Sequence, residues 1–389
     1  TYEPLYRDCY QSFPLDPDAA MCHWRVAWDH YLHRGADAGN LLREHLRRFP
    51  GSADAPAALY FLGRLAQGSD EDGAARAYYD EIVHRYPNYY FAILARERLK
   101  EVHAPPSPET TAFLHEIAFP PRARALDFVP DAISKIRIER ARLLVEAGLD
   151  DWAEGELRFG AQTGAQPQVL AIRLAELASR REGPAQAMSY IKHYASGYLY
   201  LPIDSAPAEF WKLAFPMPYR ADLDRFARRN GLDPFLLAAL IRQESEFNPK
   251  VISPANARGL TQIVPSTGRE LSRRLKIRHY STARLFQPAV NLELGSYYLK
   301  SIADSVGGRW EVALAAYNAG ASRAHAWLGW GDFREPAEFI ETVPFSQTRN
   351  YIQTVLRNAE MYRKLYGGVE TEKASFRLPT AAPKSASLK

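Results

Sequence analysis

The spacing of hydrophobic residues predicts consecutive helices, broken by short turns, over the first 205 residues of this chain. Apolar residues recur there at the intervals that place them on one face of a helix. Four such amphipathic segments are predicted at residues 131–147, 151–162, 168–179 and 184–195. The first 205 residues are therefore expected to be entirely α-helical.

Two of the helical segments resemble each other and indicate a repeat. GNLLREHLRRFP ends at Pro50, and RAYYDEIVHRYP ends at Pro87, 37 residues later, with the same arginine, aromatic and proline ending. A period of this length is typical of stacked helix pairs, as in tetratricopeptide-like arrays. Such an array has a concave surface on which a partner or a second domain can dock, although a plain helical scaffold without a binding role fits the sequence equally well.

The composition changes where the array ends. Proline and aromatic residues are frequent over residues 197–220, which predicts a packed crossing between domains. More helical patterns follow as far as Gly367, and the residues after it are rich in Ala, Ser, Pro and Lys, which is typical of disorder. We expect a helical array over 1–205, an interface over 206–220, a second α-helical domain over 221–368 and a disordered tail over 369–389.

One helix of the second domain has the strongest pattern. Asp233 is a predicted N-cap with Pro234 in the first helical position, and Asn248-Pro249 is expected to end the helix about four turns later. Glu244 occupies the next position on the apolar face of this helix, which is formed by Leu236, Leu237, Leu240 and Ile241.

A carboxyl group on a buried face near a helix C-terminus is expected to have a raised pKa. Burial disfavours the charged form, and the negative end of the helix dipole disfavours it further. Glu244 could then hold a proton near neutral pH and donate it as a general acid. A salt-bridged glutamate at a helix end is the alternative. Glu246, two residues on, is expected to point away into solvent.

Four blocks that begin at Gln243 resemble the catalytic domain of the soluble lytic transglycosylases, relatives of goose-type lysozyme. The blocks stand in the family's order, which makes the resemblance far more specific than a single motif. They are Gln243-Glu244-Ser245 with Asn248-Pro249 and Ser253-Pro254, then Gly259-Leu260-Thr261-Gln262, then Ala316-Tyr317-Asn318-Ala319-Gly320, and finally Glu341-Thr342-Val343-Pro344-Phe345 with Thr348-Arg349-Asn350-Tyr351.

The resemblance implies a lysozyme-like α domain behind a tetratricopeptide-like superhelix. It implies cleavage of the MurNAc–GlcNAc β-1,4 bond of peptidoglycan with a 1,6-anhydromuramic product, no cofactor, no metal, and a place in the periplasm or cell envelope. Glu244 is implied as the single acid/base. The implied substrate-binding residues are Ser253, Gln262, Tyr317, Asn318, Tyr351 and, in a supporting role, Glu341.

Two of these residues have simpler interpretations without the resemblance. Ser253 would be a turn serine before Pro254, and Tyr351 would be an aromatic residue of the core. With the resemblance, the hydroxyl of Tyr351 is expected close to Glu244.

The chain departs from the family pattern at four positions. Thr261 and Val264 stand where methionine is usual, and Gln347 stands where glutamate is usual. Asn256 replaces a common glycine, which is tolerable because asparagine accepts left-handed backbone angles better than most residues. The first two changes bear on the sugar-subsite preference, and none of the four touches the predicted acid/base.

The composition limits which kinds of structure and site the chain can form. With 389 residues, 47% of them hydrophobic, the chain can bury a large core, and no apolar run is long enough to predict a membrane span. Cys9 and Cys22 permit one disulfide without requiring it, and the ten histidines are scattered rather than grouped as metal ligands. The start at Thr1, without an initiator methionine or a signal-peptide pattern, fits a mature or trimmed form of a longer protein.

The positive charge is concentrated in the second half of the chain. Residues 215–367 carry 21 Lys and Arg against 14 Asp and Glu, a net charge of +7, which leaves −3 of the total +4 for the other residues. By charge alone this suits a polyanionic cell-wall glycan or a nucleic acid equally. The resemblance favours peptidoglycan glycan strands as the partner, with no nucleic acid.

Two other functions fit parts of the pattern. The first is a muramidase that uses water in place of the substrate's own hydroxyl. The second is a glycan-binding scaffold with an inactive catalytic fold, which the presence of Glu244, Ser253, Gln262 and Tyr351 together argues against. The sequence leaves endo or exo preference and any dependence on peptide stems open.

Overall fold

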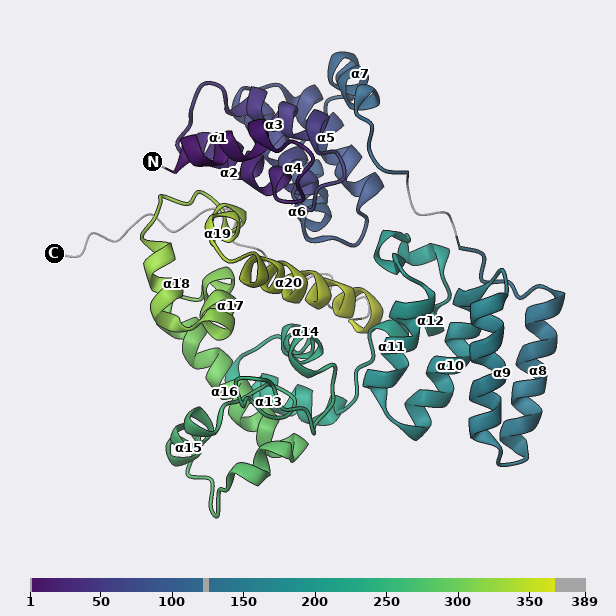
Figure 1. Ribbon diagram of the computed structural model, residues 1–389. Helices are drawn as coiled ribbons and strands as arrows, with labels where there is room; N and C mark the ends of the chain where they lie inside the picture. Colours follow the sequence, from purple (N-terminus) through teal and green to yellow (C-terminus); the bar gives the residue numbers. More distant parts are fainter. Residues whose placement is uncertain (1, 122–125, 368–389) are drawn as a thin grey trace. The chain divides into compact units, whose positions relative to one another are not determined.

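The structure is a computed structural model that describes residues 2–121 and 126–367. These residues form α-helices without a β-strand, which confirms the predicted all-α class (Figure 1). The predicted tail over 369–389 lies outside the described residues. None of the described helices is long and apolar enough to cross a membrane.

The α-helices, in chain order, are α1 (Glu3–Ser12), α2 (Ala19–Leu32), α3 (Ala38–Arg48), α4 (Ala55–Gly68), α5 (Asp72–Arg85), α6 (Tyr90–Leu99), α7 (Pro108–Glu116), α8 (Ala132–Glu146), α9 (Asp150–Thr163), α10 (Pro167–Arg181), α11 (Pro184–Tyr194), α12 (Ala208–Ala214), α13 (Arg220–Asn230), α14 (Pro234–Ser245), α15 (Pro265–Arg274), α16 (Pro288–Ser305), α17 (Trp310–Ala319), α18 (Ala321–Leu328), α19 (Pro336–Thr342) and α20 (Ser346–Tyr366). Three short 3-10 helices cover Tyr198–Tyr200, Ile203–Ser205 and Thr282–Phe286.

The described residues divide into two compact units. The first unit comprises residues 2–121 and 327–344, with α1–α7 and α19, and the second comprises residues 126–326 and 345–367. This grouping differs from the predicted boundaries, because α8–α12 group with the later helices and the segment 327–344 groups with α1–α7. Whether residues 221–368 fold as a domain of their own stays a prediction.

The first unit is built from helix pairs, as the repeat predicted. Each helix from α1 to α5 packs on the next one in the chain, and α7 packs on α5 (Figure 1). The two similar segments occupy equivalent places, because α3 ends at Arg48 before Phe49-Pro50 and α5 ends at Arg85 before Tyr86-Pro87. Stacking of this kind buries the shared core between neighbouring pairs.

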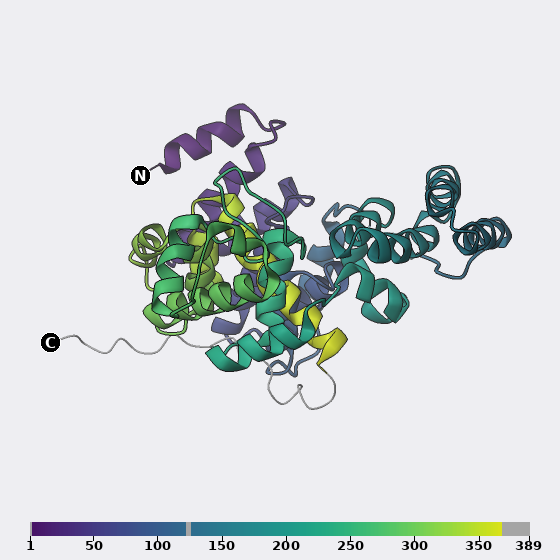
Figure 2. The same ribbon diagram turned by 90° about the horizontal axis from the view of Figure 1, so that it is seen from below.

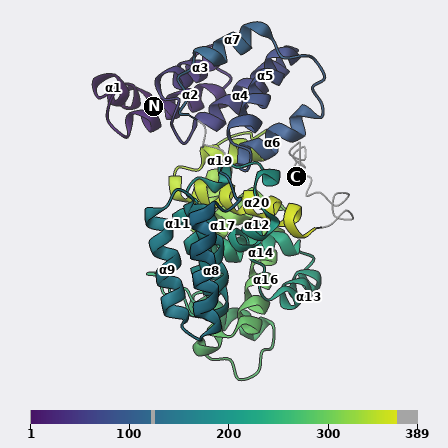
Figure 3. The ribbon, with the colours of Figure 1, turned by 90° about the vertical axis from the view of Figure 1, so that its right-hand side faces the viewer.

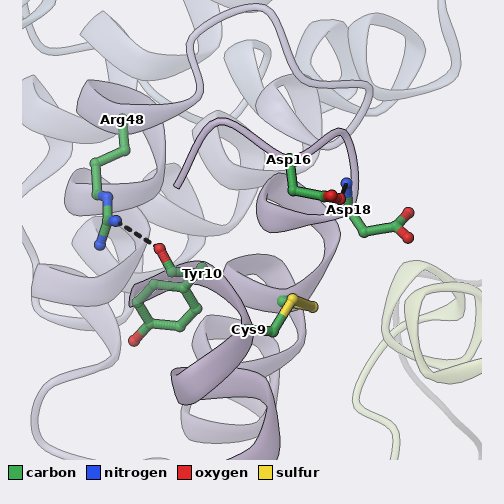
Figure 4. The surroundings of a disulfide bond; sticks show 6 residues. Cys9, Tyr10, Asp16, Asp18 and Arg48 are labelled. Atoms are coloured by element: carbon green, nitrogen blue, oxygen red, sulfur yellow. Dashed lines mark hydrogen bonds between the residues drawn. A yellow bond between two sulfur atoms is a disulfide. The ribbon is translucent and has the colours of Figure 1, made fainter. Parts of the chain in front are cut away.

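A disulfide joins Cys9 of α1 to Cys22 of α2 (Figure 4). The turn between the two helices is held by Asp16, whose carboxylate accepts a hydrogen bond of 2.8 Å from the Asp18 amide. A crosslink over 13 residues restricts the unfolded chain and stabilises the folded one by roughly 3 kcal/mol. The bond therefore fixes the first helix to the array.

A buried carboxylate attaches the segment 327–344 to the helices of the first unit. Glu335 accepts hydrogen bonds from Tyr60 Oη (2.9 Å), Arg64 Nε (3.1 Å) and Arg98 Nη2 (2.8 Å). Its side chain is 5% exposed. Two arginines from α4 and α6 thus share one carboxylate in a site that excludes most water.

The same segment is also bound through its backbone. Arg25 of α2 donates to the carbonyl oxygens of Glu341 (3.3 Å) and Pro344 (3.2 Å). Trp28 Nε1 donates to Thr342 Oγ1 at 3.2 Å. These contacts explain why this part of the sequence groups with the N-terminal helices.

Glu335→Leu is expected to lower the free energy of unfolding of the first unit by about 3–5 kcal/mol, because it leaves two partly buried arginines without their counter-charge. Urea unfolding followed by tryptophan fluorescence measures this. Glu97→Gln, which removes an exposed glutamate paired with Lys100, is the matched control and should change stability by less than about 0.5 kcal/mol. A cost for Glu335→Leu as small as that of the control would contradict the role given to this carboxylate.

The second unit begins with a row of helices. α8 packs on α9, α9 on α10, α10 on α11 and α11 on α12 (Figure 2), and α8 and α9 lie side by side (Figure 3). All four amphipathic segments predicted from the sequence are helices here. Among the remaining helices α14 packs on α13 and along α20, while α17 packs on both α16 and α20.

The predicted crossing over 197–220 is tied to α14 by one buried cation. Arg242 of α14 is 6% exposed and donates to the carbonyl oxygen of Ala214 (2.9 Å from Nη2) and to Tyr198 Oη (3.0 Å). Its guanidinium lies over the ring of Phe215, 4.3 Å from the centroid. The crossing is therefore part of the core around α14.

Candidate active site

Helix α14 positions the predicted acid/base. Asp233 is the N-cap, as predicted, and its side chain accepts a hydrogen bond of 2.8 Å from the Phe235 amide. The helix ends at Ser245, earlier than the predicted end at Asn248, because Glu246 and Phe247 both adopt left-handed backbone angles (φ 51° and 62°). The sequence could not show this, since neither residue is a glycine. Glu244 consequently lies in the last turn.

Glu246 corrects a second expectation. Its side chain forms an ion pair with Lys192 of α11, so it is not a solvated charge without a partner. The backbone of Glu246 is left-handed, and the partner of its carboxylate comes from α11.

Glu244 is half-buried, and Tyr351 of α20 donates a hydrogen bond of 2.5 Å to its Oε1. Burial raises the pKa of Glu244 to about 7, although the Tyr351 hydrogen bond acts in the opposite direction. Burial also raises the pKa of Tyr351 well above its usual value, so its hydroxyl stays protonated and can donate. The raised pKa of Glu244 agrees with the expectation from the apolar helix face.

The alternative of a salt-bridged glutamate is not what the structure shows. Among the described residues Glu244 has no ion pair, and burial and the Tyr351 hydrogen bond are the two causes of its pKa shift. No second carboxylate in this part of the chain therefore lies close enough to shift its pKa. The site has one carboxyl group that can gain and lose a proton near neutral pH.

Tyr317 and Asn318 come from the end of α17. Tyr317 Oη donates to the carbonyl oxygen of Thr261 at 2.7 Å. Burial raises the pKa of Tyr317, and the charge of Glu244 raises it further. Asn318 is exposed, and its Oδ1 accepts a hydrogen bond of 2.8 Å from Thr348 of α20. Helices α14, α17 and α20 thus bring Glu244, Tyr317, Asn318 and Tyr351 together.

The turn that carries Gln262 is held by a residue that the sequence did not single out. Asn291 of α16 is fully buried, and its Oδ1 accepts from both the amide (2.8 Å) and the hydroxyl (2.6 Å) of Thr261. Its Nδ2 donates to the carbonyl oxygens of Arg258 (2.9 Å) and Leu285 (2.8 Å). In the sequence, the only sign of this role was that an asparagine precedes the apolar stripe of α16.

Two glycines allow this close packing. A Cβ on Gly259, whose φ is 73°, would lie 2.2 Å from the carbonyl oxygen of Leu285. A Cβ on Gly295 would lie 2.2 Å from Thr261 Oγ1. Gln262, with φ 50°, follows in the same turn, and its Nε2 donates to the Gly259 carbonyl at 2.8 Å. Its side-chain carbonyl is not used in that bond.

Ser253 stabilises a turn through two hydrogen bonds. Its amide donates to the Ala257 carbonyl (2.9 Å), and its Oγ accepts from the Ala257 amide (3.1 Å). Asn256 within this turn has φ 61°, as expected for an asparagine in a glycine position. Because Oγ accepts in this bond, its own O–H remains able to donate to a ligand.

Glu341 belongs to α19 of the first unit and is buried there, with 1% exposed. It is therefore not among the predicted site residues that the second unit brings together, and its supporting role stays a prediction. The described residues contain no group of three or more His, Cys, Asp or Glu that could hold a metal ion.

The pH dependence of catalysis should report the pKa of Glu244. An acid with a pKa of about 7 loses its proton as the pH rises through 7, so kcat/KM should fall about tenfold per pH unit above it. Tyr351→Phe removes a hydrogen bond that lowers this pKa, so the falling limb should move to higher pH. Reaction rates measured from about pH 5 to about pH 9 test both statements. A limb that stays in place or moves to lower pH in the variant would contradict this assignment.

Comparisons with known proteins show which proteins this chain is similar to. The family model described as the transglycosylase SLT domain matches residues 224–340. The soluble lytic murein transglycosylase of Salmonella typhimurium is 37% identical over 158 residues, which are 40% of this chain and 24% of that protein. The enzyme of the same name from Escherichia coli is 36% identical over 159 residues, 40% of this chain and 25% of its own length. These alignments span about a quarter of the length of the curated relatives.

Solved structures show a similar fold over almost all of the chain. An inactive mutant of the lytic transglycosylase Slt from Pseudomonas aeruginosa has a TM-score of 0.69 at 24% identity and covers 93% of this chain and 54% of its own. The 70 kDa soluble lytic transglycosylase of Escherichia coli has a TM-score of 0.61 at 21% identity, covering 94% of this chain and 60% of its own. At these identities the likeness concerns the fold, and it supports the predicted superhelix with a lysozyme-like part.

Proposed function

Because the chain belongs to the soluble lytic transglycosylase family, as its sequence motifs predicted, we propose that it cleaves the MurNAc–GlcNAc β-1,4 bond of peptidoglycan without water. The observation that carries this proposal is Glu244, whose pKa of about 7 lets one carboxyl group act as an acid and then as a base. A carboxyl with an ordinary pKa would be ionised at neutral pH and could not start the reaction.

In the first step Glu244 donates its proton to the glycosidic oxygen, and the bond between this oxygen and C1 of the muramic sugar breaks. The Tyr351 hydroxyl, 2.5 Å from Oε1, stabilises the carboxylate that forms. In the second step the carboxylate takes the proton of the muramic C6 hydroxyl while that oxygen bonds to C1. The product is a 1,6-anhydromuramic end, and Glu244 regains its proton.

The substrate's own hydroxyl is the proposed nucleophile because a second carboxylate is missing from the described surroundings of Glu244. Glycosidases that activate water or form a covalent sugar adduct canonically use a pair of carboxylates. An attacking group on the same sugar gains from proximity instead. The muramic N-acetyl group, held by Asn318, could assist at C1 in place of the absent carboxylate.

We propose that Ser253, Gln262, Tyr317 and Asn318 bind the sugars around the cleaved bond, with Tyr351 on the acid/base and Glu341 in a supporting role. Glycan strands of peptidoglycan are the proposed partner, and the periplasm or cell envelope is the proposed location because the substrate lies there. A hydrolytic muramidase is the competing function. An inactive glycan-binding scaffold is disfavoured, because such a protein has no need of a half-buried carboxyl with a matched pKa.

Digestion of purified cell wall in heavy-oxygen water tests the proposal. Mass spectrometry should find muropeptides that are lighter by one water than hydrolysis products and carry no heavy oxygen. Labelled reducing ends would show hydrolysis instead and would point to Glu341 as the base for water. Absence of any cleavage would favour the binding scaffold.

A further inference from the structure

A cavity of about 580 Å³ opens between α3, α5 and α7 of the first unit. Its lining includes Arg43 and Arg47 of α3, Tyr78 of α5 and Phe113 of α7. Small-molecule sites in proteins typically measure about 300–1,000 Å³. The proposed cleavage site is built from residues of the second unit, so this cavity has no part in it.

Four charged side chains line the cavity, and none of them forms an ion pair with another described residue. They are Arg43, Arg47, Glu71 and Glu109. Their neighbours behave differently, since Arg48 of the same helix α3 pairs with Glu44 at 3.1 Å. Two positive and two negative charges therefore share one cavity without neutralising each other directly.

The two arginines are held in place by aromatic residues. Arg43 Nε donates to Tyr78 Oη at 3.2 Å, and the guanidinium of Arg47 lies 4.8 Å from the centroid of the Phe113 ring. Tyr78 and Phe113 in turn meet edge to face, with centroids 6.5 Å apart. The arginines are four positions apart on α3 and so lie on one helix face. Most of their N–H donors remain available to a ligand.

We propose that this cavity binds a short peptide with a free carboxylate and a free ammonium group. Arg43 and Arg47 would hold the carboxylate, since guanidinium groups pair with carboxylates in two parallel hydrogen bonds. Glu71 and Glu109 would hold the ammonium group, and the Phe113 ring would cover the apolar part between them. A phosphate or a polyanion fits less well because the two glutamates repel it, and a neutral sugar leaves all four charges unused.

This inference rests on the proposed function, because a peptide stem of peptidoglycan, although amide-linked to the sugar at its amino end, carries free carboxylates and, on a diamino-acid residue, a free ammonium group. The first unit would then recognise the peptides of the same polymer whose glycan the second unit cleaves. Binding at two places on one polymer raises the effective concentration of substrate at the cleavage site.

The test is an NMR titration of the complete chain with trialanine, a peptide whose only charges are its two ends. Trialanine should bind, and N-acetylation or C-terminal amidation should each weaken binding at least fivefold. The double variant Arg43→Gln with Arg47→Gln should weaken it at least tenfold. Arg180→Gln, which changes an exposed arginine of α10, is the matched control. This variant should bind trialanine as tightly as the original chain does.

Several outcomes would overturn the proposal. These are no binding of trialanine, equal binding by the double variant, or equal binding of the end-blocked peptides. Binding of inorganic phosphate or acetate as strong as that of trialanine would show a simple anion site. Glu71→Gln changes an exposed side chain, so it tests the ammonium side even if the double variant fails to fold, as judged by circular dichroism. The Glu71→Gln substitution should weaken the binding of trialanine but not the binding of acetate.

A cleavage assay separates this inference from the proposed function. The double variant should cleave glycan strands stripped of peptides as fast as the original chain, whereas on peptide-bearing strands its KM should rise at least threefold with kcat unchanged. An equal KM on peptide-bearing strands would leave the transglycosylase intact but contradict the peptide role. Absence of cleavage by the original chain would contradict the proposed function alone, because trialanine binding is measured without catalysis.

Discussion

Glu244→Gln is expected to reduce the cleavage of peptidoglycan by at least a hundredfold and to leave the fold intact. General acid–base catalysis typically contributes a factor of about 10² to 10⁴. Because one residue serves here in both half-steps, the loss should reach the upper end of that range or exceed it. The amide has nearly the shape of the carboxyl group but can neither donate a proton to the leaving oxygen nor accept one from the C6 hydroxyl.

Thermal unfolding provides the control for the fold. The folded-state pKa of Glu244 is raised to about 7 from an ordinary value of 4.5, so its stability contribution is lost as the pH rises through 7. The glutamine never becomes charged, so the variant should be at least as stable as the original chain at about pH 8. Glu246→Gln, which removes only the partner of Lys192, should keep most of the activity. A rate for Glu244→Gln above about a tenth of the original would exclude the acid/base role.

A fragment that begins at residue 221 is expected not to fold, although the motifs of the active site all lie within it. The cut removes Tyr198 and the carbonyl of Ala214, the hydrogen-bond acceptors of buried Arg242. Leaving a buried charge without its partners costs about 3–5 kcal/mol. The cut also removes the ring of Phe215 over this guanidinium.

The matched fragment is residues 126–367, which keeps every helix of the second unit. Its far-ultraviolet circular dichroism and its cooperative urea transition should persist, whereas the fragment 221–367 should lack the transition. Tyr198→Phe in the complete chain removes one acceptor of Arg242 and should cost about 1–3 kcal/mol. A cooperative transition and full activity in the shorter fragment would contradict this expectation and show that the catalytic part folds independently.

Helical periodicity was sufficient for most of the fold. The segment predicted at 168–179 is α10 (Pro167–Arg181), and the one predicted at 184–195 is α11 (Pro184–Tyr194). The grouping of α8–α12 with the later helices was not predictable, because it depends on contacts such as that of Arg242 with Tyr198 between positions far apart in the sequence. Local patterns carry no information on such pairs.

Some features of the candidate active site could be predicted from the sequence, and others could not. The apolar face of α14 was enough to predict a raised pKa for Glu244, because burial is its main cause. The contact of Tyr351 with Glu244 came only from the family resemblance, since periodicity alone predicted a core aromatic. The early end of α14 depends on the left-handed backbone of Glu246, which an ordinary glutamate in the sequence does not reveal.

The contact between Thr261 and Gly295 has an evolutionary consequence. The amide and the hydroxyl of Thr261 both donate hydrogen bonds to Asn291. The side chain of Thr261 occupies the space beside Gly295 where a Cβ would otherwise stand. A methionine at position 261 would lack the hydroxyl hydrogen bond, and its longer side chain would need more room. Positions 261, 291 and 295 should therefore covary across the family. Replacing one of these residues by that of a relative should destabilise the protein more than replacing all three together.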